Sequence, residues 1–332
     1  MKAMRSHQTG GPETLTLDEI DVPTPGKGEV LVAVKACAIN YPDTLIIRDL
    51  YQFKPERPFA PGGELAGVVE AVGESVESFK VGDRVMAGIG NGGLAEKVVV
   101  PATRMFHVPE GVPFKKAASL LMTYGTTIHG LKDRGHIKEG DTVLILGAAG
   151  GVGLSAVELA KAFGARVVAA VSSEEKGEVA RKAGADEVVI YTKDEMDKAA
   201  SKELANAFKA ACGPEGANIV YDIVGGQYSE PALRSIAWEG RFLVVGFPAG
   251  IAKMPLNLTL LKSCDICGVF WGAFTAREPV KFREQVEELF DMMQAGKIDP
   301  LVSETFPLER AGDAIAKLEN RKAVGKLVVT MD

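Results

Sequence analysis

The sequence lacks any long hydrophobic run, and this absence bounds where the protein can work. A membrane-spanning helix needs roughly 20 consecutive apolar residues, and no run in the 332 residues approaches that length. The N-terminus, Met1-Lys-Ala-Met-Arg-Ser-His7, has no hydrophobic stretch of the kind found in secretory signal peptides. We therefore expect a cytoplasmic protein with no membrane partner.

Cysteine and histidine are also scarce, with four of each in the chain. The cysteines are too few and too unevenly placed for a disulfide framework, which suits a reducing compartment. Cys264 and Cys267 form one C-x-x-C, but a structural zinc site needs a second pair of ligands at a recognisable spacing. We interpret both as small core residues, with a redox or metal role as the alternative, and we expect no metal site. The other cysteines and the histidines are Cys37, Cys212, His7, His107, His129 and His136.

An excess of positive charge is missing as well, because the formal net charge is −6. A nucleic-acid partner favours a basic face, and none is evident, so we expect no nucleic acid to bind. What the sequence does contain is 46% hydrophobic residues in a chain long enough for one or two sizeable cores. These features predict a soluble enzyme with two domains.

The most informative segment is a short apolar strand, 142–146, that leads into a glycine-rich turn and an amphipathic helix ending at Gly164. Such a turn brings the backbone close to a pyrophosphate, and the helix directs its unsatisfied N-terminal amides and positive dipole end at that anion. The G-x-G-x-x-G pattern is imperfect, because Ala148 stands at its first glycine. The strand-turn-helix context nevertheless predicts a dinucleotide phosphate site. Its predicted residues are Gly147, Ala148, Gly150, Gly151, Val152 and Gly153.

The residues after the second strand, 166–171, indicate which nucleotide binds. An NAD-preferring site ends this strand on an acidic residue that binds the ribose hydroxyls. Here Ser172, Ser173 and Lys176 follow, and these side chains can hydrogen-bond and neutralise a 2′-phosphate. Either serine can also cap the next helix with Glu175 closing a capping box, and the two roles can coexist. We predict NADP(H) rather than NAD(H) as the cofactor.

Six strand-like segments within residues 142–271 predict a doubly wound domain with a complete Rossmann sheet. The chain before them is β-rich and broken by Pro-Gly and Gly-Asp turns, and the chain after them contains two helical stretches and a last strand. We predict that both flanking regions form one domain, 1–123 with 272–332, around an inserted domain, 124–271. The six predicted strands are 142–146, 166–171, 187–191, 218–223, 241–246 and 266–271.

Six short motifs follow one another along the whole chain in a specific order and spacing. They are Pro61-Gly-Gly-Glu-Leu-Ala-Gly-Val-Val69, Val81-Gly-Asp-Arg-Val85, Gly92-Gly-Leu-Ala-Glu96, the turn from Gly147 to Gly153, Tyr221-Asp-Ile-Val-Gly-Gly226 and Gly325-Lys-Leu-Val-Val329. With them the chain resembles the medium-chain dehydrogenase/reductase superfamily and, within it, the zinc-independent quinone oxidoreductases. The resemblance implies an α/β fold in which a GroES-like β-rich catalytic domain accompanies a six-stranded doubly wound Rossmann domain.

The chain departs from the zinc-dependent alcohol dehydrogenases of this superfamily at the metal ligands. Where those enzymes carry a cysteine ligand three residues before an aspartate, this chain has Asn40 before Asp43, and it has Gly62-Gly63-Glu64 in place of their Gly-His-Glu. Their cysteine-rich zinc lobe is missing, because 88–93 joins the two flanking strands directly. Alcohol oxidation loses its main electrostatic aid without a Lewis acid, whereas reduction of an activated acceptor does not need one.

The resemblance implies hydride transfer from C4 of NADPH to a quinone or to the β-carbon of an α,β-unsaturated carbonyl. The protein must place the two partners, exclude water and supply a hydrogen-bond donor to the developing oxyanion. Asn40 stands at a metal-ligand position, and its amide can donate to the nicotinamide carboxamide or to the substrate. Tyr41 and Tyr51 are candidate phenolic donors, with a core or rim aromatic as the alternative for each.

The resemblance also assigns cofactor contacts residue by residue. Thr126 matches a threonine near the nicotinamide, and Tyr191 matches a tyrosine beside the 2′-phosphate. Gly246 and Phe247 match a turn over the nicotinamide ring, and Lys326 is assigned to the cofactor site as well.

For the electrophilic acceptor, the resemblance implies that Trp271 shapes the substrate pocket, and we also assign Arg48 to this pocket. It also implies a homodimer in which the apolar edge strand near 266–271 pairs with its copy across a two-fold axis. Unpaired, such an edge would be an aggregation hazard.

Two other functions stay open at this point. An enoyl-thioester reductase of the same fold would use Arg48, Lys54 and Arg57 to meet coenzyme A phosphates, although the cluster is sparse. A structural or interaction protein that binds NADPH without important turnover is the other possibility.

Overall fold

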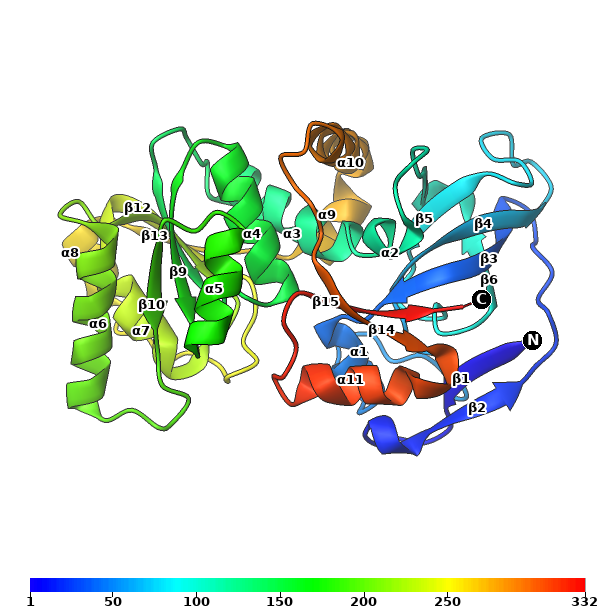
Figure 1. The fold of residues 1–332 in the computed structure, drawn as a ribbon, viewed down its shortest axis with the longest axis horizontal. Helices are drawn as coiled ribbons and strands as arrows, with labels where there is room; N and C mark the ends of the chain where they lie inside the picture. The colour runs from blue at the N-terminus through cyan, green and yellow to red at the C-terminus, as the bar shows by residue number, and fades with distance from the viewer. Residues whose placement is uncertain (332) are drawn as a thin grey trace. The chain divides into compact units, whose positions relative to one another are not determined.

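The computed structural model describes residues 1–331, and these residues form two compact units. Unit 1 runs from Met1 to Met122 and resumes at Pro300, and unit 2 comprises Thr123–Asp299 (Figure 1). The chain therefore enters unit 2 once and leaves it once, as expected for an inserted domain.

Unit 2 is built on a six-stranded, all-parallel sheet with the order β10-β9-β8-β11-β12-β13. Its central strands are continuous apolar runs because both faces are covered, and side chains such as Leu144, Val168 and Phe242 are fully buried in its core. The strands are β8 (Thr142–Leu146), β9 (Arg166–Val171), β10 (Glu187–Ile190), β11 (Ala217–Asp222), β12 (Ile236–Val244) and β13 (Asp265–Gly268).

Helices cover both faces of this sheet, as a doubly wound fold requires. Figure 1 shows α4 and α5 on one face and α6 and α7 on the other. The helices are α4 (Gly151–Ala162), α5 (Glu174–Lys182), α6 (Lys198–Cys212), α7 (Ser229–Leu233) and α8 (Asn257–Lys262).

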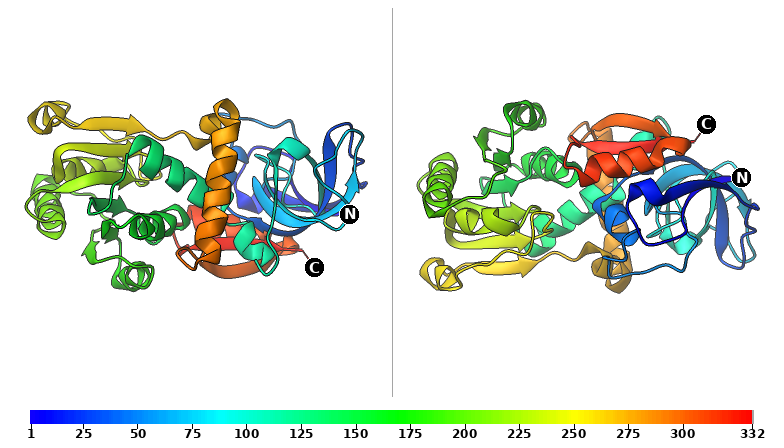
Figure 2. Two further views of the ribbon diagram at one scale, coloured as in Figure 1. Left: turned by 90° about the horizontal axis from the view of Figure 1, so that it is seen from above. Right: turned by 90° about the horizontal axis from the view of Figure 1, so that it is seen from below.

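Two further helices, α9 (Trp271–Arg277) and the long α10 (Pro279–Gln294; orange in Figure 2), also belong to unit 2. Polar contacts explain this, because Lys281 pairs with Asp133 at 2.8 Å and Gln285 Nε2 donates to the same carboxylate at 2.9 Å. The division therefore differs from the predicted domains, which gave residues 272–299 to the first domain. Sequence patterns indicate that these helices exist but not which core they pack on.

The sixth strand is shorter than its predicted span of 266–271. β13 ends at Gly268, and Trp271 begins α9. A short apolar run does not distinguish the end of a strand from the start of a helix.

The segment where the chain enters unit 2 is an irregular helix. Leu121–Gly125 is π-helical, α3 (Thr126–Ile128) follows, and His129–Arg134 is π-helical again. Departures of this kind from α-helical geometry occur frequently at functional sites.

Unit 1 contains a seven-stranded sheet in which six strands follow the order β14-β15-β3-β4-β5-β7 and β6 pairs with β3. Its core includes Val32, Leu65, Val85 and Val329, whose side chains are almost fully buried. The strands are β3 (Glu29–Ala38), β4 (Glu64–Val72), β5 (Arg84–Gly88), β6 (Lys97–Pro101), β7 (Met105–His107), β14 (Val302–Pro307) and β15 (Lys326–Thr330).

The rest of unit 1 consists of short elements around that sheet. Helix α1 (Tyr41–Ile46) follows β3, and α11 (Ala311–Glu319) precedes β15. A separate ribbon pairs β1 (Lys2–Ser6) with β2 (Leu15–Glu19), and α2 (Phe114–Ala117) lies near the entry to unit 2 in the sequence. Within residues 1–331, no helix is both long and apolar enough to cross a bilayer.

Candidate functional site

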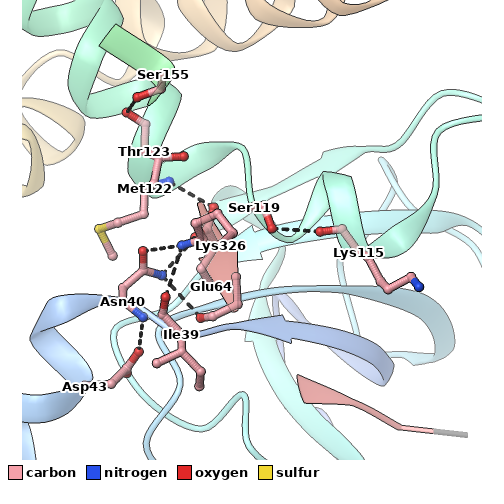
Figure 3. A network of polar contacts seen from close by, with 11 residues as sticks. Ile39, Asn40, Asp43, Glu64, Lys115, Ser119, Met122, Thr123, Ser155 and Lys326 are labelled. Atoms are coloured by element: carbon pink, nitrogen blue, oxygen red, sulfur yellow. Dashed lines mark hydrogen bonds and ion pairs between the residues drawn. The ribbon is translucent and has the colours of Figure 1, made fainter. Parts of the chain in front are cut away.

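A buried polar cluster lies in unit 1 where three strands meet. Asn40 follows β3, Glu64 begins β4 and Lys326 begins β15. Strand register brings them together, because Ala38 of β3 is paired with Glu64 on one side and with Val328 on the other. Figure 3 shows the three side chains pointing toward one another.

The contacts within this cluster are short and mutually satisfied. Lys326 Nζ donates to Asn40 Oδ1 at 2.6 Å and to the Ile39 carbonyl at 3.2 Å, and it lies 3.6 Å from Glu64 Oε2. The Asn40 amide nitrogen donates to Glu64 Oε2 at 2.9 Å and to the Ala38 carbonyl at 3.2 Å. Both Asn40 amide hydrogens and its oxygen are thus engaged within unit 1, so Asn40 has no spare amide donor in this arrangement.

Two buried carboxyl groups shape the electrostatics of the cluster. Burial raises the pKa of Glu64 and lowers the pKa of Lys326, while the attraction between the two opposes both shifts. Glu64 Oε1 also accepts from the backbone amide of Met122 at 2.9 Å, and Met122 is the last residue of unit 1 before the chain enters unit 2. Burial raises the pKa of Asp43 to about 6, although hydrogen bonds from the Asn40 and Gly62 amides favour its charged form.

The two tyrosines predicted as proton donors have different surroundings. Tyr41, the first residue of α1, is 39% exposed. Tyr51 is half-buried against the core of unit 1, and burial together with the nearby Asp43 raises its pKa. The Tyr51 phenol therefore keeps its proton at neutral pH and can act as a donor.

Two of the three basic residues near α1, Arg48 and Arg57, are already paired. Arg48 makes a bidentate contact with Glu319, with Nε and Nη2 at 2.8 and 3.1 Å from its two carboxylate oxygens. Arg57 donates to Asp49 at 2.8 Å and to the Ile47 carbonyl at 3.0 Å. Neither guanidinium is poised for a coenzyme A phosphate, which weakens the enoyl-thioester interpretation.

In unit 2, the glycine turn between β8 and α4 is tightly constrained. Gly147 has a φ of +73°, which favours glycine, and a Cβ added at Gly153 would lie 2.2 Å from the Gly147 carbonyl oxygen. Helix α4 begins at Gly151, and no side chain caps its N-terminus. Its first-turn amides are therefore left without a side-chain partner, which fits the binding of a phosphate anion.

At the end of β9 the structure shows the capping role, whereas the binding of a 2′-phosphate stays a prediction. Ser173 is the N-cap of α5 and accepts from the Lys176 amide at 3.4 Å. Burial and the nearby cation of Lys193 lower the pKa of Lys176. Two ammonium groups close enough to affect each other favour an anion beside them. Tyr191 follows β10, and its ring lies 4.6 Å from that of Tyr228.

The other predicted cofactor and pocket residues of unit 2 lie at ends of elements. Thr126 begins α3, and Gly246 and the 55% exposed Phe247 follow β12. A Cβ at Gly125 would lie 2.9 Å from Trp271 Nε1, so the missing side chain makes room for the indole. That indole nitrogen is buried without a hydrogen-bond partner among the described residues.

No three His, Cys, Asp or Glu side chains converge to form a metal site anywhere in residues 1–331. All four cysteines are buried and unbridged, as expected for core residues.

Sequence reasoning missed Glu64, Asp43 and Lys193 as members of these sites. Glu64 carried a signal, because a glutamate opening an apolar strand demands a partner if it is buried. Lys193 carried none, since only the fold brings it close to Lys176.

Comparisons with known proteins agree with this architecture. A family model described as "Alcohol dehydrogenase GroES-like domain" matches residues 26–110, and one described as "Zinc-binding dehydrogenase" matches 151–295. The fold and these two matches define a dehydrogenase with a GroES-like and a Rossmann domain, which confirms the predicted fold class.

Individual relatives narrow the class further. The chain is 37% identical to a quinone oxidoreductase-like protein 2 homolog of Nematostella vectensis, over 99% of this chain and 88% of the relative. It resembles the structure of Escherichia coli quinone oxidoreductase complexed with NADPH, with a TM-score of 0.90 and 30% identity over all of both chains. A mycobacterial protein complexed with NADPH gives a TM-score of 0.91 and 34% identity, also over both complete chains. The chain belongs to the quinone oxidoreductase family of the medium-chain dehydrogenases/reductases and is an oxidoreductase.

Proposed function

We propose that this protein is an NADPH-dependent reductase that works without zinc and transfers hydride to a quinone or an α,β-unsaturated carbonyl. The observation that carries the proposal is the buried cluster of Asn40, Glu64 and Lys326. Asn40 stands where the resemblance places a metal ligand of the zinc-dependent enzymes, and the polar atoms of the cluster bind one another. The ammonium 2.6 Å from Asn40 Oδ1 would repel a divalent cation at this position.

The glycine turn of unit 2 supports NADPH as the cofactor. The uncapped start of α4 offers backbone amides to the pyrophosphate, and a side chain at Gly153 would collide with the turn. Lys176 and Lys193 form the cationic side of the predicted 2′-phosphate site. Solved structures of the two relatives above contain NADPH.

When bound, NADPH supplies a hydride from C4 of its nicotinamide. The chain's own residues provide the positioning and the proton donor. The predicted donation from Asn40 is not available in this arrangement, because Lys326 and Glu64 already bind its amide. The proton donor is therefore Tyr51, whose raised pKa keeps a proton on its phenolic oxygen. Trp271 gives the acceptor pocket an apolar wall, consistent with a flat, uncharged electrophile.

We further propose that the protein is a homodimer formed through β13. This strand pairs with β12 on one side and with no other described strand on the other. Ile266 and Phe270 are 39% and 60% exposed, and Leu260 on neighbouring α8 is 80% exposed. Pairing with a second copy would cover this apolar edge.

The test is NADPH oxidation followed at 340 nm against quinones, enones, crotonyl-CoA and simple aldehydes, repeated with NADH and with a chelator. We expect chelator-resistant turnover of quinones or enones that prefers NADPH. Loss of activity on chelation, or stoichiometric zinc in the purified protein, would contradict the metal-free mechanism. Preferred turnover of crotonyl-CoA would favour the enoyl-thioester function. Tight NADPH binding with no turnover would favour an interaction protein.

A further inference from the structure

One carboxylate on α4 holds both segments through which the chain enters and leaves unit 2. Tyr124 lies at the entry, and its phenolic oxygen donates to Glu158 Oε2 at 2.7 Å. Asp299 is the last residue before the exit, and its backbone amide donates to the same oxygen at 2.9 Å. Residues 175 positions apart in the sequence therefore share a single acceptor atom.

A second contact ties the entry segment to the same helix. Ser155 lies one turn before Glu158 on α4, and its hydroxyl donates to the Thr123 carbonyl at 3.2 Å and lies 2.7 Å from the Thr127 hydroxyl. Both Ser155 and Thr127 are fully buried. The residues on either side of Thr126 are thus fixed to α4.

Helix α4 begins at the glycine turn, so its N-terminus and its third turn serve different parts of the proposed cofactor site. Its N-terminus faces the pyrophosphate position, and its third turn holds the segment that carries Thr126, which we predict lies near the nicotinamide. Movement of the Thr123–Thr127 segment relative to α4 would therefore change the distance between the sites for the nicotinamide and the pyrophosphate.

We infer that Glu158 is a positioning residue, which sets the nicotinamide end of the cofactor site relative to the pyrophosphate end by holding Tyr124 and Asp299 on α4. The inference rests on the proposed function. It concerns chemistry that Glu158 does not touch, so its effect must pass through the Thr123–Thr127 segment.

The hydrogen bond between Tyr124 and Glu158 is maintained over a wide pH range. Tyr124 is 2% exposed, and burial together with the Glu158 charge raises its pKa well above the ordinary range for a phenol. The tyrosine stays protonated and keeps donating at every physiological pH. A hydrogen bond to a charged acceptor is also stronger than a neutral one.

Three substitutions separate geometry from charge. Glu158→Ala removes the acceptor, Glu158→Gln retains an acceptor oxygen without the charge, and Tyr124→Phe removes the entry contact alone. Lys161→Ala is the matched control, because Lys161 lies on the same helix and pairs with Asp186 at 2.9 Å. Each variant is compared with the wild type in its NADPH dissociation constant, its kcat, its primary isotope effect with C4-deuterated NADPH, and hydrogen exchange without cofactor.

We expect Glu158→Ala to accelerate amide exchange about tenfold in peptides covering 123–128 and 297–299, because each contact removed is worth about that factor. We expect its kcat to fall about tenfold with a larger isotope effect, and its NADPH affinity to change little, because the phosphate contacts remain. Tyr124→Phe should affect only the entry segment, and Lys161→Ala should resemble the wild type. Glu158→Gln should lose less than Glu158→Ala, because it keeps the acceptor oxygen and loses only the charge.

Unchanged exchange and kcat in Glu158→Ala would overturn the inference, as would equal losses in Glu158→Gln and Glu158→Ala. A change in thermal stability without any change in kcat or isotope effect would mean that Glu158 is merely structural, which also contradicts it. If the wild type shows no NADPH turnover, the proposed function fails, and the exchange data still decide whether Glu158 joins the two segments.

Discussion

At the scale of single residues, charge pairing decides what each candidate side chain can do. Lys326 and Glu64 are both buried and bind each other through one amide, Asn40, whereas Lys176 and Lys193 repel each other. The first arrangement is complete within unit 1 and stabilises it. In the proposed function, the 2′-phosphate of NADPH binds beside these lysines and offsets their repulsion.

Removing either lysine of the second pair should therefore discriminate between the two nicotinamide cofactors. We expect Lys176→Ala and Lys193→Ala to raise the KM for NADPH tenfold or more, because a hydrogen bond to a charged group is worth about 1.5–3 kcal/mol. The KM for NADH should hardly change, since NADH has no 2′-phosphate. Steady-state kinetics with both cofactors make the comparison, with Lys182→Ala on the same helix as the control. Equal effects on both cofactors would refute the assignment.

Breaking the buried ion pair should have a large effect on stability. In Lys326→Met the Glu64 carboxylate loses its buried counter-charge, and we expect the free energy of unfolding to fall by about 3–5 kcal/mol. Adding Glu64→Gln should recover part of this loss, because the unpaired charge is then removed. Urea denaturation of the single and double variants measures the free energy of unfolding of each. Additive losses would show that the two residues are not coupled.

At the scale of elements, the N-terminus of α1 links pH to stability. The pKa of Asp43 is about 6 in the folded protein and near 3.9 when unfolded, so the folded state holds the proton more tightly. The contribution of Asp43 to the free energy of unfolding is constant below about pH 4. The free energy of unfolding then falls as the pH rises from about 4 to 6, and it is constant again above that. The difference amounts to about 3 kcal/mol.

Asp43→Asn tests this linkage, because an amide does not titrate. We expect the variant to lose most of the decline between pH 4 and 6, and to be less stable at every pH, since Oδ1 alone cannot accept from both Asn40 and Gly62. Glu64 has a raised pKa of the same sign, so a smaller slope should persist. Urea midpoints across this range provide the data, and identical slopes in both proteins would count against the linkage.

The glycine turn before α4 offers a second test at this scale. A Cβ at Gly153 would lie 2.2 Å from the Gly147 carbonyl oxygen, whereas a Cβ at Gly150 would meet nothing nearer than 3.6 Å. We expect Gly153→Ala to lower the Tm markedly and to abolish tight NADPH binding, while Gly150→Ala costs about 1 kcal/mol or less. Calorimetry and cofactor titration of both variants would reveal the contrast, and equal tolerance would mean that the turn is not constrained.

At the scale of the whole molecule, we propose that two copies assemble through the open edge of β13. Ile266→Glu places a charge on that edge and should convert the proposed dimer to a monomer. Light scattering after gel filtration measures the mass directly, with exposed Val280→Glu on α10, 71% exposed, as the control. A wild-type protein that is already monomeric would remove the basis for this prediction.

The sequence by itself determined the class of the molecule. Apolar strands, a glycine turn and an amphipathic helix are local patterns, so all six strands of the Rossmann sheet were predicted, and motif order indicated the family that the comparisons confirm. The last strand predicted after the Rossmann sheet is present as β15, and α10 and α11 are helices of that region. Local periodicity missed the ribbon of β1 and β2, and it extended β13 into Trp271.

Only the tertiary structure decided what the polar residues contact. Lys326 and Asn40 are separated by 286 positions, and strand register alone brings the ammonium to the amide. The same holds for Arg48, predicted for the substrate pocket and found paired with Glu319, and for Tyr124 and Asp299, which share Glu158. Local pattern reflects backbone and burial preferences of neighbouring residues, whereas such pairings depend on which strands and helices meet, and the fold alone sets that.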